Sequence, residues 1–115
     1  MSKLAKFLIE DLQGDWSKPS LKFFRSNDAY GYVIWLTLMY SYSEKENVSI
    51  ETIIKKVENY ASRRTIIDFI NKGVEANFII KKNSTDDKRK IFVEPSDITI
   101  KEYEEWSNEF IKSVV

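Results

Sequence analysis

The sequence contains neither cysteine nor histidine among its 115 residues. Without cysteine there can be no disulfide, no thiolate zinc site and no cysteine nucleophile. Without histidine, the commonest general base and the commonest metal ligand are missing. The three glycines are too few and too scattered for a loop that cradles nucleotide phosphates. We therefore expect no enzymatic activity, no catalytic residue, no metal site and no cofactor.

Long hydrophobic runs are also missing. No stretch approaches the ~18 consecutive apolar residues of a membrane-spanning helix. The start of the chain, Met1 to Lys6, lacks the apolar segment of a signal peptide. We therefore expect no membrane partner and a cytoplasmic location. Hydrophobic residues still make up 43% of the chain and aromatic residues 14%, which is enough to form the core of one globular domain.

Neither sign of charge is in excess, because 18 basic residues balance 18 acidic ones. Their distribution along the chain is uneven. Ten basic and five acidic residues lie between Lys55 and Lys90, whereas residues 1–54 carry a net charge of −1 and residues 91–115 a net charge of −4. Such segregation can create one face that attracts phosphates while the whole chain stays neutral. A solvated surface without a partner is the alternative interpretation.

Three helices are predicted in the first half of the chain. Apolar residues recur at helical spacing from Ser2 to about Gln13, residues 14–15 end this helix, and residues 16–20 read as a linker. A second helix, about Asp28 to Tyr42, is apolar on nearly every face and is expected to lie at the centre of the domain. Ser49 is expected to cap a short third helix, Ile50 to about Val57, with one buried face.

The second half predicts a helix followed by a two-stranded hairpin. Ser62 is a good N-cap for a helix over about residues 62–76, and Asn77 is suited to a left-handed exit. The apolar runs 78–80 and 91–93 read as strands joined by a polar loop at 83–90. The short turn between the last two helices is typical of a helix-turn-helix. We expect a mainly α protein with a small β-hairpin wing, a winged helix-turn-helix with flanking helices.

The predicted helix at 62–76 and the loop at 83–90 carry the candidate DNA-binding residues. Arginines near a helix start can bond guanine bidentately or bind phosphate, and the helix N-terminus adds amide donors. Asp68 would repel phosphates, or accept a bond from cytosine; Ile67 could touch a thymine methyl, or belong to the core. Asp86 and Asp87 could orient Arg89. The candidates are Ser62, Arg63, Arg64, Thr65, Asp68, Asn71, Lys72, Lys88, Arg89 and Lys90.

Residues 62–66, 75–79 and above all 87–93 resemble the MarR-type winged-helix transcriptional regulators. Asp87 and Arg89 match the Asp-x-Arg pair of that family's wing, which implies a minor-groove role for Arg89. Gly73 stands where family members usually have a large apolar residue. The resemblance covers about residues 26–113, within one domain over 1–115: an N-terminal helix and linker (1–25), a winged-helix core (26–96) and a C-terminal helix (97–115).

The two terminal segments carry apolar stripes on predicted helices. Residues 99–102 read as a capping box at the start of the last helix. The resemblance implies that the terminal helices of two subunits pack together, so we expect a homodimer. Folding of both helices back onto their own subunit is the alternative. The interface candidates are Leu4, Phe7, Leu8, Tyr103, Trp106 and Phe110.

The sequence therefore favours a sequence-specific DNA-binding transcriptional regulator, with the recognition helix at about 62–76 in the major groove and the wing, 83–90, at the minor groove or backbone. Double-stranded DNA is the expected partner. Two alternatives are a winged helix that binds proteins, and a DNA-binding protein of phage or plasmid replication. Aromatic residues could line a pocket for a small-molecule effector, or form the core; they are Trp16, Phe23, Phe24, Tyr30 and Trp35.

Overall fold

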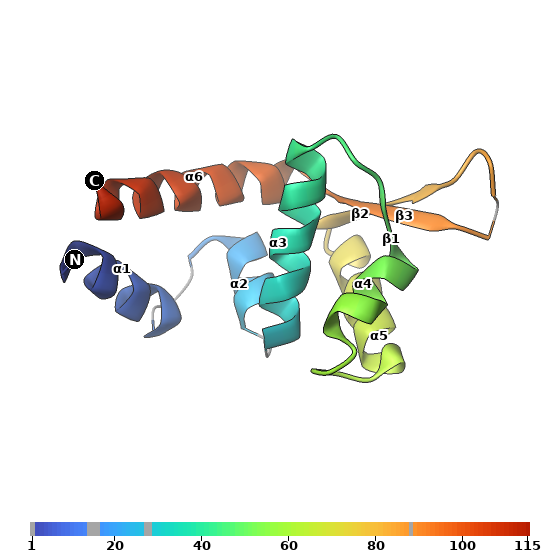
Figure 1. Cartoon of the computed structure of the whole chain (residues 1–115), viewed down its shortest axis with the longest axis horizontal. Helices are drawn as coiled ribbons and strands as arrows, with labels where there is room; N and C mark the ends of the chain where they lie inside the picture. Colours follow the sequence, from blue (N-terminus) through green and yellow to red (C-terminus); the bar gives the residue numbers. More distant parts are fainter. Residues whose placement is uncertain (1, 14–16, 27–28, 88) are drawn as a thin grey trace.

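The structure, a computed structural model, describes residues 2–13, 17–26, 29–87 and 89–115. Its elements are, in order, α1 (Ser2–Gln13), α2 (Pro19–Arg25), α3 (Ala29–Ser43), β1 (Val48–Ser49), α4 (Ile50–Val57), α5 (Arg63–Glu75), β2 (Ile79–Asn83), β3 (Ile91–Pro95) and α6 (Asp97–Val114). Helix α3 stands in the middle, with α1 and α6 at one end and α4, α5 and the hairpin at the other (Figure 1). The predicted winged helix-turn-helix with flanking helices is confirmed.

Helix α3 forms the centre of the core, as its uniform hydrophobicity predicts. Ile34, Trp35 and Leu38 are completely buried. Contacts with α2, α4 and β3 cover most of α3, and its remaining side carries the half-buried Val33, Leu36 and Thr37. Fully burying an apolar side chain of this size stabilises a fold by about 1.5–3 kcal/mol. The helix-turn-helix adds further buried side chains to this core: Ile53, Val57, Ile66, Phe69 and Ile70.

Three serines cap three helices. The hydroxyl oxygens of Ser49 and Ser62 accept bonds from backbone amides at 3.1 and 3.2 Å, as expected from the sequence. The predicted capping box at 99–102 is wrong, because Ser96 caps α6 three residues earlier. Thr99 is buried and donates its hydroxyl to the Phe78 carbonyl at 2.8 Å. Glu102 is buried too, and its carboxylate accepts from the Ser20 amide at 2.8 Å, joining α6 to α2.

Two elements differ from the sequence-based expectation. Residues 19 and 20, expected in a linker, begin helix α2, with Pro19 in the first turn where its missing amide costs nothing. The expected helix stop at 14–15 and residue 16 of the linker lie outside the described residues. The hairpin gains a third strand, since β1 pairs antiparallel with β3, Val48 opposite Val93. The sheet order is β1–β3–β2. A two-residue strand is too short to show alternation in the sequence.

The exit from α5 fixes how closely the hairpin approaches that helix. Asn77 has a φ of 64°, which confirms the left-handed exit. Beyond it, the Phe78 amide donates to the Gly73 carbonyl at 2.8 Å, the pattern of a Schellman motif. A Cβ atom on Gly73 would lie 2.6 Å from Cδ1 of Ile79. The absence of a side chain at this position therefore lets β2 pack directly against α5.

Candidate nucleic-acid interface

The start of α5 presents two arginines in different states. Arg63 is bound to Glu51 of α4: Nη1 donates to Oε2 at 2.9 Å, and Nη2 donates to Oε1. The guanidinium lowers the pKa of the Glu51 carboxyl through these bonds, and the carboxylate in turn raises the pKa of Arg63. Arg64 is exposed and forms no hydrogen bond or ion pair with the described residues. Only Arg64 is thus immediately available to an anion.

The cap of α5 uses two of the candidate residues. The Ser62 hydroxyl accepts from the Thr65 amide and donates to the Thr65 hydroxyl at 3.0 Å. Both side chains are exposed, but their hydroxyl groups already form hydrogen bonds within the first turn of α5. The Ser62 cap holds the first turn of α5, and therefore Arg63 and Arg64, in a fixed orientation.

Further along α5, Asp68 and Lys72 follow Arg64 at intervals of four residues and share its ridge on the helix surface. All three are exposed, and Asp68 lies between the two cations. Asn71 lies on the neighbouring ridge, where its amide oxygen accepts from Nζ of Lys81 at 2.6 Å. This bond ties α5 to β2. Sequence reasoning left out Lys81, although its strand position opposite α5 could have indicated it.

The wing tip is held together by its own polar side chains. The Ser84 hydroxyl accepts from the amides of Asp86 and Asp87, both at 3.2 Å. A carboxylate oxygen of Asp87 accepts from the Arg89 amide at 2.9 Å and lies 3.7 Å from Nε of the same residue. The Arg89 side chain is 95% exposed. Asp87 therefore shapes the turn that presents Arg89, while Lys88 lies outside the described residues.

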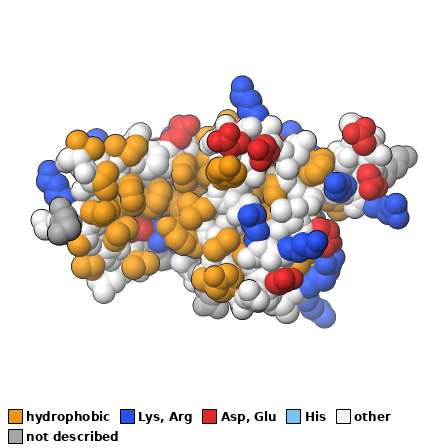
Figure 2. All heavy atoms as spheres, viewed as in Figure 1, with side chains coloured by type: hydrophobic (Ala, Val, Ile, Leu, Met, Phe, Trp, Pro, Cys, Tyr) orange, Lys and Arg blue, Asp and Glu red, His pale blue; other side chains and the backbone are white. Residues whose placement is uncertain are grey.

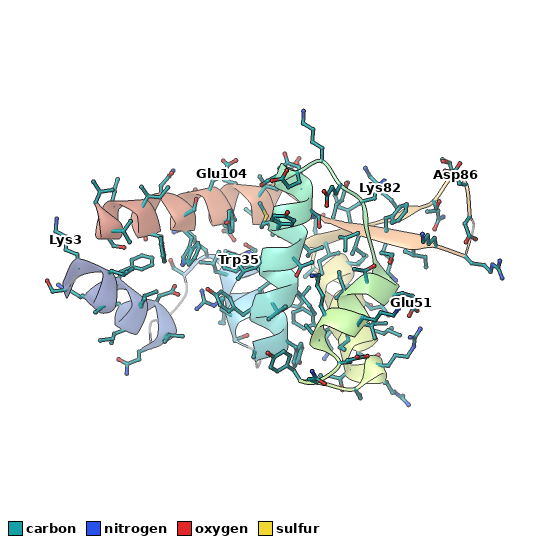
Figure 3. The ribbon with its side chains drawn as sticks, in the orientation of Figure 1. Lys3, Trp35, Glu51, Lys82, Asp86 and Glu104 are labelled. Carbon is teal, nitrogen blue, oxygen red and sulfur yellow. The ribbon has the colours of Figure 1, made fainter. Side chains whose placement is uncertain are left out.

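A hollow of about 240 Å³ separates the wing from the helix-turn-helix. Its walls include the apolar side chains of Ile50, Ile67 and Ile91. Ile67, expected either in the core or in contact with a thymine methyl, therefore lines this hollow. Its charged lining residues are Glu51, Arg63, Lys81, Arg89 and Lys90. Figure 3 places Glu51 beneath the wing and the labelled Lys82 on the hairpin above it. Lys and Arg side chains gather over this end of the molecule in Figure 2.

This face has the chemistry of a polyanion-binding surface. It combines arginine and lysine donors with exposed helix and wing positions, which suits binding to phosphates. Among the described residues, no group of three or more carboxylates is arranged to hold a metal ion. In the same described ranges, no helix has both the length and the hydropathy to cross a membrane.

The dimer candidates lie at the opposite end, where they largely pack within their own chain. The Trp35 ring contacts those of Tyr103 and Trp106 at centroid distances of 5.2 and 5.1 Å. Phe7 contacts Phe110 edge-on at 5.6 Å. Leu4 is half-buried, and Leu8 is 39% exposed. The remaining exposed apolar side chains of these two helices are Ile9, Leu12, Ile111 and Val114.

A buried polar cluster attaches α1 to the rest of the chain. Asp11 of α1 pairs with Arg25 of α2 at 2.8 Å, and both side chains are almost fully buried. The same carboxylate accepts from the Trp106 indole at 3.0 Å. The Arg25 guanidinium lies over the Tyr32 ring, 4.2 Å from its centroid. Helix α1, which has no fully buried residue of its own, is therefore anchored through Asp11.

The aromatic residues considered for an effector pocket are core residues where they are described. Phe24 and Trp35 are completely buried, and Phe23 stacks on Phe69 at 4.5 Å. Tyr30 meets the same Phe69 ring edge-on at 5.4 Å, and Trp16 lies outside the described residues. The core interpretation of these aromatic residues thus holds.

Comparison with solved structures places this fold among known ones. A mutant of MepR, from a multidrug-resistant S. aureus clinical isolate, matches 96% of this chain and 76% of its own at 16% identity, with a TM-score of 0.62. The heme sensor protein PefR, bound to heme and carbon monoxide, matches 96% and 73% at 13% identity, with a TM-score of 0.61; PefR is from Streptococcus agalactiae. No family model and no curated protein sequence matches the chain. The likeness supports the winged helix-turn-helix fold with flanking helices expected from the sequence.

Proposed function

We propose that this chain is a sequence-specific DNA-binding transcriptional regulator of the MarR-like type. Helix α5 would lie in the major groove, and the wing, 83–90, at the minor groove or the backbone. The observation that carries the proposal is the set of exposed cations without partners among the described residues at one end of the fold: Arg64, Lys72 and Lys90, with Arg89 presented by Asp87. Arg89 and Lys90 line the hollow between α5 and the hairpin, whereas Arg64 and Lys72 lie on the exposed ridge of α5.

The electrostatics of this end are compatible with a neutral chain. Each phosphate neutralised by a cation releases counterions, so affinity depends on the local cations and not on the net charge. Arg64 and Lys72 flank Asp68 on the exposed ridge of α5, which leaves that ridge with a net charge of +1. Asp68 would then select among bases, because a carboxylate in the major groove accepts from cytosine and repels most other contacts.

The test is the binding of the protein to AT-rich duplex DNA over a salt series, measured by fluorescence anisotropy. The double variant Arg64→Ala/Arg89→Ala should bind more weakly, and its log–log salt slope should be shallower by about 0.9 per lost phosphate contact. Lys3→Ala/Lys6→Ala is the matched control, since it removes two exposed cations from α1. Equal losses in both variants, or no wild-type binding at low salt, would refute the proposed interface.

A homodimer through α1 and α6 belongs to the same proposal. Ile9, Leu12 and Ile111 are 55%, 70% and 54% exposed; the first two lie on α1 with Leu4, Phe7 and Leu8, and Ile111 lies on α6. Tyr103, Trp106 and Phe110 pack inside the subunit and would support that surface from below. A second copy would cover this apolar end and place two recognition helices for two half-sites.

A small-molecule effector is the least developed part of the proposal. The hollow of about 220 Å³ between α1, α2 and α6 is its best place, because Trp106 and Phe7 line it together with the acidic Glu10 and Glu109. Those carboxylates favour a cationic aromatic compound. PefR binds heme, whereas this chain has neither histidine nor cysteine, so only its tyrosines and methionines could ligate such an iron. We further propose a cytoplasmic protein without enzymatic activity.

Two observations distinguish the alternatives. A winged helix that binds proteins would show no salt-dependent DNA affinity, and the ion pair of Arg63 with Glu51 would then be a purely structural contact. A replication-associated protein would bind duplexes without strong sequence preference. Selection of a preferred duplex from a random pool separates that alternative from a regulator.

A further inference from the structure

The contact between Glu51 and Arg63 joins the two helices of the helix-turn-helix at their exposed starts. Both terminal nitrogens of the guanidinium donate to the two carboxylate oxygens, so the fork is fully occupied on that edge. The two side chains are 60% and 61% exposed. An ion pair this exposed is weak and opens readily in competition with another anion.

A DNA phosphate that binds the Nη1–Nη2 edge of Arg63 would have to displace Glu51 from it. Bidentate recognition uses two parallel N–H donors of the guanidinium, and a carboxylate and a phosphate cannot share them. While the pair is closed, Arg63 adds little attraction, and an approaching phosphate also meets the charge of Glu51. The sequence predicts that Arg63 contacts DNA, whereas in the structure its guanidinium is already bound to Glu51, so DNA and Glu51 would compete for it.

Glu51 has a second cation available when Arg63 leaves. Lys55 follows it by four residues on α4, the spacing and order at which a glutamate and a lysine attract each other along a helix. Glu51 also lies in the first turn of α4, where the helix dipole favours a negative charge. When the ion pair opens, Lys55 and the start of α4 therefore still provide positive charge near the Glu51 carboxylate.

We propose that Glu51 is a selectivity residue: it withholds Arg63 from non-specific phosphates and yields it only to a duplex whose contacts outcompete the carboxylate. The inference rests on the proposed DNA binding and adds to it a means of discrimination. Glu51 acts through Arg63 and is a positioning residue. It lowers affinity for all duplexes, but it lowers affinity for the wrong ones more.

The experiment measures Kd for a random-sequence duplex and for a duplex enriched by the wild-type protein, each over a salt series. Glu51→Gln keeps the shape of the side chain and removes its charge. Its Kd for the random duplex should fall by roughly tenfold, with a salt slope steeper by about 0.9, the value for one further phosphate contact. The gain on the enriched duplex should be smaller, so the ratio of the two affinities narrows.

Two controls separate this role from simple removal of charge. Glu58→Gln removes another exposed carboxylate at the end of α4 and should change Kd less than twofold. In an Arg63→Ala background, Glu51→Gln should lose most of its effect. An equal gain from Glu58→Gln, or an undiminished gain without Arg63, would overturn the inference while leaving DNA binding intact. If wild type fails to bind but Glu51→Gln binds, the regulator proposal falls and the competition stands; if neither binds, both fail.

Discussion

The two ends of this molecule expose very different side chains, although both protrude from the same α3-centred core. Hydrophobic atoms cover much of the end formed by α1 and α6, whereas Lys, Arg, Asp and Glu side chains gather at the end formed by α4, α5 and the wing (Figure 2). Leu12 is 70% exposed at the first end, and Arg89 is 95% exposed at the second. An apolar end without a cover fits another protein surface, and a charged end fits a polyanion.

The polar contacts of the two ends differ in the same sense. Asp11 and Arg25 form a nearly buried pair that anchors α1. Glu51 and Arg63 form a pair open to solvent on both sides. Removing one partner of a buried pair leaves a costly charge, whereas opening an exposed pair costs little. The Asp11–Arg25 pair is therefore expected to stay closed, and the Glu51–Arg63 pair to open more readily.

The largest expected effect comes from placing charge on the apolar end. Leu12→Glu/Ile111→Glu should weaken self-association by more than about 1,000-fold, because each introduced carboxylate would be desolvated in the interface. Sedimentation velocity over a concentration series measures this, and circular dichroism checks the fold. Tyr60→Glu, at another exposed apolar position, is the control. If both proteins sediment as the wild type does, the apolar end is no dimer interface.

The next effect concerns the buried pair. Asp11→Asn keeps an acceptor for Trp106 but removes the charge that faces Arg25, so the free energy of unfolding should fall by about 3 kcal/mol. Urea unfolding followed by tryptophan fluorescence gives the value. Glu10→Gln, an exposed neighbour on α1, should leave it unchanged. A loss below 1 kcal/mol for Asp11→Asn would mean that α1 is anchored by its apolar contacts.

The third effect is a difference in salt dependence between DNA binding at the charged end and self-association at the apolar end. If four cations, Arg64, Lys72, Arg89 and Lys90, contact phosphates, raising the salt from 50 to 200 mM should weaken DNA binding by about 100-fold. The Kd of self-association through the apolar side chains of α1 and α6 should change little over that range, because salt does not screen the burial of apolar surface. Titrations of labelled DNA and of labelled protein measure the two equilibria. Parallel salt dependence would contradict the division between the ends.

The smallest effect tests how α5 is joined to the wing. Asn77→Ala should cost about 1 kcal/mol of stability, because alanine is less tolerant than asparagine of the φ of 64° at this position. Asn77→Gly adopts that conformation freely and serves as the matched control. Thermal unfolding compares the three proteins. A Asn77→Ala variant as stable as wild type would show that the exit from α5 is not set by this residue.

Sequence patterns determined most of the fold because its signals are local. Hydrophobic periodicity, the Ser49 and Ser62 caps and the left-handed Asn77 each act within a few residues, and the structure contains all of them. The missed features depend on tertiary contacts. Strand β1 exists only because β3 lies beside it, and the Thr99 hydroxyl, expected to cap α6, is instead used by the distant Phe78 carbonyl.

The candidate interface was less predictable for the same reason. Charge and spacing indicated Arg63, Arg64 and Arg89 equally, but no local signal shows that Glu51, twelve residues earlier, would occupy one of them. The sequence does not predict the role of Lys81, because its bond to Asn71 forms only when the hairpin folds back onto α5. The DNA-binding and dimer residues themselves remain predictions.

The most direct test of the division between the ends is the mapping of backbone amide shifts in ¹⁵N-labelled protein as duplex DNA is added. The account predicts that shifts concentrate at the starts of α4 and α5 and at residues 83–90, while α1 and the second half of α6 stay unchanged. Shifts concentrated in α1 and α6, with the wing unaffected, would contradict it.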